Sequence, residues 1–317
     1  MLDLPLKPLS DSTGKPSVVT TTYGDPPDRM DVYIPAGADA ESNLPGVVLE
    51  LGVHPQPIDH PDVVRIAEAI SRAGVVVGVP DSTPLRNLVL TPAEPRHLAE
   101  AFLALQSRPE VDPSRVGIAG FSAGASIGLL SATDPRIADD VSFVSDFGGY
   151  ASAEELLVDV VTNTCECGTG GEVRAWAADP RIREDITTLL TGAAESPADK
   201  DAVAEVLAAT DRATAEAAIE SFSSELRSNL ASLSPVNSAD AIEAPVFILH
   251  GEPDTAIPVS HAAELADAIG DNVVRFTRFG RFGHGQPGAN GLTVDDAGDI
   301  AALTMYLRDI VAAVTES

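Results

Sequence analysis

The sequence predicts an α/β protein with a doubly wound, mostly parallel sheet of eight strands and a helical cap inserted after the sixth strand. Three observations support this prediction. Short apolar segments alternate with amphipathic segments along most of the chain, which is typical of β–α–β units. One apolar segment passes through Gly-x-Ser-x-Gly directly into a run of small residues. The alternation stops over residues 151–243 and then resumes.

The first half of the chain supplies most of the predicted sheet. Residues 18–23 and 30–34 resemble two short strands joined by a Gly-Asp-Pro-Pro turn, which predicts an antiparallel hairpin. The segments that follow alternate in type. We expect strands at 46–51, 75–79, 115–121 and 141–147, and helices at 60–73, 92–106 and 123–132.

Residues 151–243, called the insertion below, are helical in pattern and acidic, with eighteen Asp and Glu residues against six Arg and Lys residues. One crossover helix needs far fewer residues, so the excess predicts a helical cap. A lengthened connection without a lid role is the alternative. The core is then formed by residues 1–150 and 244–317, with later strands at 245–249 and 273–279 and helices at 260–269 and 293–314.

Residues 116–125 carry the strongest functional signal. A Ser between a strand and a helix adopts a strained backbone, and its neighbours two positions away must be small. Gly120 and Gly124 meet that requirement. The turn predicts that the Ser122 hydroxyl is an exposed nucleophile and that the Ala123 N–H, at the start of a helix, faces an oxyanion. A Gly/Ser loop without catalytic function is the alternative.

A serine hydroxyl needs a base to take its proton, and a carboxylate to fix the tautomer of that base. His284 lies in a glycine-rich loop just after the last predicted strand, which makes it the expected base. The other histidines precede the nucleophile or lie in predicted helices and strands, where a structural role is expected: His54, His60, His97, His250 and His261.

The acid is expected in the turn after strand 245–249, where Asp254 is the first choice. Glu252 in the same turn and Asp146 at the end of strand 141–147 are alternatives. A carboxylate that only stabilises a turn or caps a helix is the non-catalytic interpretation of each.

A second oxyanion donor is expected in the loop after strand 46–51. The N–H of Val53 is the first candidate and that of His54 the next, since the following proline has no N–H. His54, Phe147, Tyr150 and Arg86 are expected, with the insertion, to shape the substrate pocket.

Together these motifs resemble the α/β-hydrolase superfamily, nearest the dienelactone-hydrolase-like and prolyl-oligopeptidase-like serine hydrolases. The resemblance covers roughly residues 16–317, interrupted by the insertion. It implies a catalytic triad of Ser122, Asp254 and His284. Two positions depart from the family: Ser122 stands where dienelactone hydrolases have cysteine, and Leu51 stands where the usual motif has His. The matching segments are residues 120–124, Ser234-Pro235-Val236, His250-Gly251-x-x-Asp254 and Gly283-His284.

The predicted function is hydrolysis of a small-molecule carboxylic ester through an acyl-enzyme, without cofactor or metal. A peptidase, an amidase or an acyltransferase on the same triad are alternatives. The peptidase is disfavoured because peptidase relatives usually carry a large accessory domain. A binding protein of this fold that has lost catalysis is a further alternative.

Composition restricts the possible partners and location. The chain has 48 Asp and Glu residues against 20 Lys and Arg residues, a net charge of −28. Such a charge repels nucleic acids and anionic membranes, so neither is expected as a partner. No signal peptide or membrane-length apolar run is visible, which predicts a cytoplasmic location. The sequence carries no signal of oligomeric state.

Two cysteines are present, Cys165 and Cys167. No second pair of Cys or His residues lies at ligand spacing, so they are not expected to bind a metal. We expect them to be ordinary loop residues that contribute no disulfide framework.

Overall fold

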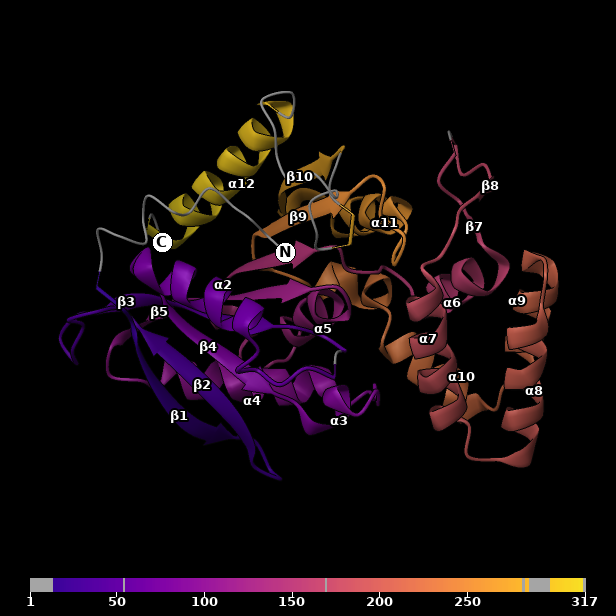
Figure 1. The fold of residues 1–317 in the computed structure, drawn as a ribbon, viewed down its shortest axis with the longest axis horizontal. Helices are drawn as coiled ribbons and strands as arrows, with labels where there is room; N and C mark the ends of the chain where they lie inside the picture. Colours follow the sequence, from indigo (N-terminus) through magenta and orange to yellow (C-terminus); the bar gives the residue numbers. More distant parts are fainter. Residues whose placement is uncertain (1–13, 54, 169, 281–282, 285–296, 316–317) are drawn as a thin grey trace.

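The computed structural model describes residues 14–315 except residues 54, 169, 281–282 and 285–296. It contains an eight-stranded sheet in the order β1-β2-β4-β3-β5-β6-β9-β10 (Figure 1). β2 is antiparallel to both of its neighbours, and the other adjacent pairs are parallel. The predicted fold class is thereby confirmed. The strands are β1 Ser17–Tyr23, β2 Asp28–Ile34, β3 Leu44–Glu50, β4 Val76–Asp81, β5 Val111–Phe121, β6 Val141–Phe147, β9 Val246–Gly251 and β10 Val273–Phe279.

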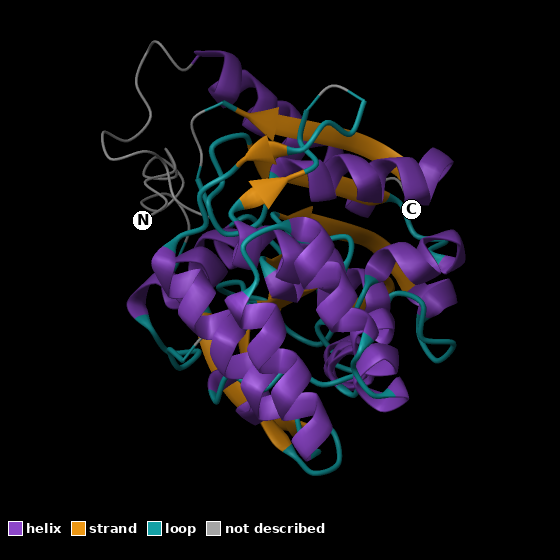
Figure 2. Cartoon of the chain, turned by 90° about the vertical axis from the view of Figure 1, so that its right-hand side faces the viewer, coloured by secondary structure: helices purple, strands orange, loops and turns teal. Residues whose placement is uncertain are grey.

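Helices cover both faces of the sheet (Figure 2). Alternate residues of a strand point to opposite faces, so Val48 packs in the cluster with α4, α5 and α11, whereas Val47 and Leu49 pack in the cluster with α2 and α12. Two buried layers result, as in other doubly wound proteins. The core helices are α2 Pro61–Arg72, α3 Thr83–Arg86, α4 Glu94–Gln106, α5 Ala123–Ser131, α11 Val259–Ile269 and α12 Ala297–Thr315.

The insertion leaves the sheet after β6 and returns at β9, and Figure 1 shows its helices grouped beside the sheet. Each helix begins after a Ser or Asp whose side chain accepts a hydrogen bond from an N–H of the first turn. The helices share an apolar cluster of their own, in which Val206 and Ile219 are buried. They are α6 Ala153–Thr162, α7 Pro180–Ala193, α8 Pro197–Ala208, α9 Arg212–Glu220 and α10 Ser224–Ser232.

Polar contacts also connect the insertion to the core. Asp159 of α6 is buried, accepts a hydrogen bond from Arg212 of α9 at 2.6 Å, and lies 3.4 Å from His261 of α11. The other ring nitrogen of His261 accepts the N–H of Ala151 at 3.2 Å. A carboxylate this deeply buried is tolerated because it is paired with a cation.

The expectation for the cysteines was wrong. Cys165 and Cys167 form a disulfide with each other. Cys165 lies in a small hairpin of β7 Thr164–Cys165 and β8 Arg174–Ala175, which the helical pattern of the insertion did not predict. The chain turns directly after β7, and the two α-carbons are 5.2 Å apart, within the range that a disulfide spans. Because the bond closes a very short loop, it constrains little of the unfolded chain.

None of the helices in the described part of the chain combines the length and the apolar character that crossing a membrane requires.

Candidate active site

Ser122 lies between the end of β5 and the start of α5, as the motif predicts. Its backbone has φ +55° and ψ −133°, a conformation that costs free energy for a residue with a side chain. A Cβ at Gly120 would lie 2.4 Å from the Gly124 oxygen, and one at Gly124 would lie 2.5 Å from the Gly52 nitrogen. Both positions must therefore be glycine for this turn to form.

The loop after β3 packs directly against this turn. Gly52 has φ +76°, and a Cβ there would lie 2.5 Å from the Gly124 nitrogen. Its N–H donates to Oε1 of Glu50 at 3.0 Å. Val53 follows and lines the same cavity as Ser122 and Ala123. His54 lies outside the described residues.

Asp254 and His284 form a hydrogen-bonded pair. His284 Nδ1 lies 2.9 Å from Asp254 Oδ2, and Asp254 Oδ1 accepts the N–H groups of Ala256 at 2.7 Å and Ile257 at 3.0 Å. Burial alone would raise the pKa of Asp254. The hydrogen bond and the charge of His284, the charge of His250 and the N–H of Ile257 outweigh burial, and the pKa is lowered. Asp254 is thus held as a carboxylate.

The pair lies close to the serine turn. The Ser122 N–H donates to the Phe147 carbonyl at 2.9 Å. The next residue, Gly148, lies against the pair, since a Cβ there would be 3.7 Å from Asp254 Oδ2 and 3.9 Å from His284 Nδ1. Ser122 follows β5, Asp254 follows β9 and His284 follows β10, so the three predicted triad residues lie at the same carboxyl edge of the sheet.

The alternative acids are placed differently. Asp146 is fully buried, and its Oδ1 accepts the Gly149 N–H at 2.9 Å. Burial raises the pKa of Asp146 to about 7. Glu252 is exposed. Among the described carboxylates, Asp254 is the one hydrogen-bonded to His284.

The remaining described histidines have structural partners. His250 Nε2 is 2.9 Å from the Ile257 carbonyl, and burial lowers the pKa of its ring. His97 contacts Asp28 at 3.1 Å, and His60 caps α2. Within the described residues, no group of three or more potential metal-ligating side chains is present.

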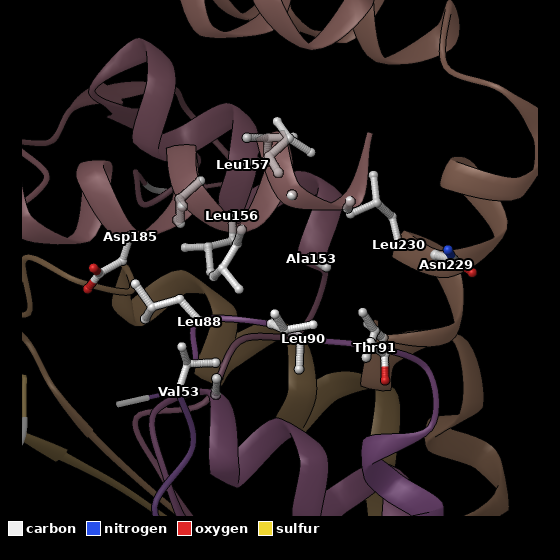
Figure 3. Close-up of a pocket in the computed structure, with 18 of the residues that line it drawn as sticks. Val53, Leu88, Leu90, Thr91, Ala153, Leu156, Leu157, Asp185, Asn229 and Leu230 are labelled. Carbon is white, nitrogen blue, oxygen red and sulfur yellow. The ribbon is translucent and has the colours of Figure 1, made fainter. Parts of the chain in front are cut away.

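A cavity of about 360 Å³ opens at Ser122 (Figure 3). Core residues Val53, Leu88 and Leu90 form one wall, and Leu156 and Leu157 of the insertion form the opposite wall. This volume falls within the usual range of small-molecule sites.

The expected pocket residues divide into two groups. Tyr150 does line the cavity. Phe147 instead packs against Phe121, with ring centroids 5.2 Å apart, and Arg86 pairs with Asp81 at 2.7 Å. The expectation that Phe147 and Arg86 shape the pocket is therefore not supported by their packing.

The structure is similar to solved structures of enzymes. Over 98% of its length it matches a Porphyromonas gingivalis dipeptidyl peptidase 4, with a TM-score of 0.59 at 14% identity. A Pyrococcus horikoshii acylaminoacyl peptidase matches over 87% of this chain, with a TM-score of 0.57 at 14% identity. A hyperthermophilic esterase from the archaeon Pyrobaculum calidifontis matches over 98% of this chain and 88% of its own, with a TM-score of 0.57 at 16% identity. The chain has the α/β-hydrolase fold.

The match differs in extent between the neighbours. This chain spans only 37% of the dipeptidyl peptidase and 39% of the acylaminoacyl peptidase, but 88% of the esterase. No protein-family model and no curated protein sequence matches it.

Two parts of this candidate site were not predicted from the sequence. Trp176, just after β8, donates its indole N–H to the Asp254 carbonyl at 2.8 Å, and the Asp179 N–H donates to the Thr255 carbonyl at 2.7 Å. The insertion thus holds the turn that carries Asp254. The second part that was not predicted is Glu50, which is buried beneath the loop that contains Gly52. Two features of the sequence could have indicated these residues: Trp176 is the single Trp of the chain, and Glu50 lies at the end of an apolar strand.

Proposed function

We propose that this protein is a serine hydrolase that cleaves small carboxylic esters through an acyl-enzyme. The observation that carries the proposal is the position of Ser122, on a strained turn at an apolar cavity, beside the hydrogen-bonded pair of Asp254 and His284. Strain at a single non-glycine residue persists where the surrounding structure enforces it, which is common for catalytic nucleophiles.

In the proposed reaction, His284 acts in turn as base and as acid. With its Nδ1–H donated to Asp254, His284 has Nε2 free to take the Ser122 proton as Oγ attacks the ester carbonyl. The N–H groups of Ala123 and Val53 stabilise the oxyanion. His284 then protonates the leaving alcohol, takes a proton from the water that attacks the acyl-enzyme, and returns it to Ser122 Oγ as the acid leaves. Asp254 cannot rotate freely, because two backbone N–H groups bind its other oxygen.

The cavity favours an ester over a peptide. Its lining is largely apolar, and core and insertion enclose it on opposite sides, which suits a compact acyl or alcohol group (Figure 3). The esterase neighbour is also matched over most of its length, unlike the two peptidases. We propose that the insertion acts as a cap that selects substrates by size.

Labelling with a fluorophosphonate probe tests the nucleophile. A single adduct on Ser122 is expected, located by peptide mass spectrometry, with Ser122→Ala as the unlabelled control. In parallel, the wild-type protein should hydrolyse a p-nitrophenyl ester of a short acid much faster than a peptide p-nitroanilide. An adduct on another residue would refute the nucleophile, and faster cleavage of the anilide would favour the peptidase alternative.

A further inference from the structure

Tyr150 is held rigidly next to the nucleophile helix. Its N–H donates to Ser126 Oγ at 2.8 Å, and Ser126 Oγ donates to its carbonyl at 2.9 Å. Since Ser126 belongs to α5, which starts beside Ser122, this reciprocal pair fixes Tyr150 relative to the nucleophile. On the other side, Ala151 is held by its hydrogen bond to His261.

The Tyr150 hydroxyl is buried but has no hydrogen-bond partner among the described residues. The residue is 2% exposed, packs with Leu156 and Ile257, and lines the cavity that contains Ser122. Burial raises the pKa of its phenol, which therefore remains a protonated donor. Buried tyrosine hydroxyls normally have a partner, because an unmade hydrogen bond destabilises the protein.

A second buried tyrosine shows the usual situation. Tyr306 is 3% exposed, and its hydroxyl lies 2.7 Å from Ser145 Oγ and 3.2 Å from the Phe247 carbonyl. Of these two phenols, the one without a partner in the described part of the protein is the one at the cavity. The partner of Tyr150 is therefore expected to be a bound molecule.

The rest of the cavity restricts what that molecule is. Its charged lining residues are Asp185 and Glu195, and no Lys, Arg or His is among the described residues that line it. Burial, and then the charges of Glu184 and Asp179, raise the pKa of Asp185. A carboxylate-bearing substrate would meet like charge without any counter-ion, so the cavity suits a neutral chain.

On the basis of the proposed ester hydrolysis, we propose that the Tyr150 hydroxyl donates a hydrogen bond to an uncharged oxygen on the substrate chain that fills the cavity. That oxygen is a ketone, ether or hydroxyl oxygen separate from the ester itself. Tyr150 is then a specificity-determining residue. The preferred substrates are neutral, largely apolar esters with one such oxygen, in preference to plain alkyl esters or half-esters of dicarboxylic acids.

The first test compares the stability of Tyr150→Phe and Tyr306→Phe in the full chain without ligand. Removing an unsatisfied hydroxyl should leave the melting temperature of Tyr150→Phe unchanged or raised. Removing the satisfied one should lower that of Tyr306→Phe. A similar decrease in both variants would show that the Tyr150 hydroxyl has a structural partner in the protein, and would overturn the proposal. This test does not depend on any enzymatic activity.

The second test uses two matched pairs of esters, with a ketone oxygen replacing a methylene group in either the acyl chain or the alcohol chain. For each protein, the preference is kcat/KM for the oxygenated ester divided by kcat/KM for the plain ester. In at least one pair, this preference should be about tenfold lower in Tyr150→Phe than in the wild type. The intrinsic reactivity of each ester cancels when the preference of the wild type is divided by that of the variant. Tyr306→Phe should keep the wild-type preference.

The outcomes separate the two proposals. If the wild type is labelled at Ser122 and hydrolyses the plain esters, but Tyr150→Phe changes neither preference, only the role of Tyr150 is wrong. If the wild type hydrolyses none of the esters, the proposed function fails, and the substrate class inferred here fails with it.

Discussion

The carboxyl edge of the core sheet and the insertion form opposite walls of one cavity, but they hold their residues in different ways. At the sheet edge, individual backbone interactions fix each group: Ser122 has φ +55°, and two N–H groups bind one oxygen of Asp254. In the insertion, apolar side chains such as Val206 and Ile219 share the packing. Single substitutions at the edge are therefore expected to stop the chemistry, and single substitutions in the insertion to alter it by degrees.

Substitution of the proposed nucleophile or base should have the largest effect. Ser122→Ala and His284→Ala should each lower kcat by about ten-thousand- to million-fold, and the double variant should be little worse, because triad members act as a unit. Steady-state kinetics on a p-nitrophenyl ester, with circular dichroism to check folding, measures this. Additive losses in the double variant would contradict a shared mechanism.

Substitution of the acid compares two carboxylates of the same sheet edge. Asp254→Asn should lower kcat by about ten-thousand-fold, because the amide cannot stabilise the required tautomer and charge of His284. Asp146→Asn should change kcat by less than about tenfold, because Asp146 is hydrogen-bonded to Gly149 rather than to His284. If Asp146→Asn or Glu252→Gln is inactive while Asp254→Asn is active, the acid is misassigned.

Trp176 is one of the residues through which the insertion contacts the turn of Asp254. Trp176→Phe keeps an aromatic ring but removes the hydrogen bond to the Asp254 carbonyl, so kcat should fall by about tenfold with little change in KM. Kinetics and thermal melting on the same preparation measure this. A lower melting temperature with an unchanged kcat would show that Trp176 only stabilises the fold, and that the two regions are functionally separate.

The sequence predicted the turn of Ser122 and the pairing of Asp254 with His284, but it predicted the insertion only in outline. Gly120 and Gly124 have no alternative in this turn, since any Cβ collides with backbone, so a short motif carries the whole geometry. The contact of Trp176 with Asp254 joins positions 78 residues apart, and no local pattern encodes it. The Leu88 to Leu90 wall of the cavity is an apolar loop segment, which is indistinguishable from core residues until the fold is known.

The insertion and the sheet edge also differ in the groups that surround their buried carboxylates. Asp159 of the insertion is paired with Arg212 and lies beside His261. At the sheet edge, Glu50 accepts the Gly52 N–H and lies near further acids, among them Glu94 and Asp81. Burial is the main cause that raises the pKa of Glu50 to about 8, so Glu50 is mostly protonated at neutral pH.

A raised pKa predicts a pH dependence of stability with a definite sign. The folded state keeps the Glu50 proton at pH values where the unfolded chain has lost it. This stabilisation is fully present below the unfolded pKa and is lost as the pH rises through about 8. Glu50→Gln cannot titrate, and its amide oxygen can still accept the Gly52 N–H. Between pH 7 and pH 9, the wild type should therefore lose about 1 kcal/mol of unfolding free energy relative to Glu50→Gln.

Reversible denaturant unfolding of both proteins at each pH measures this difference, in which the titration of all other groups cancels. Glu252→Gln is the matched control, because it makes the same Glu-to-Gln change at an exposed position two residues from Asp254. Its difference from the wild type should stay nearly constant over the same interval, because Glu252 is exposed rather than buried. A constant difference for Glu50→Gln as well would show that Glu50 is already ionised at pH 7. The loop that carries Val53 would then rest on a charged carboxylate, and the core and the insertion would not differ in how they bury acids.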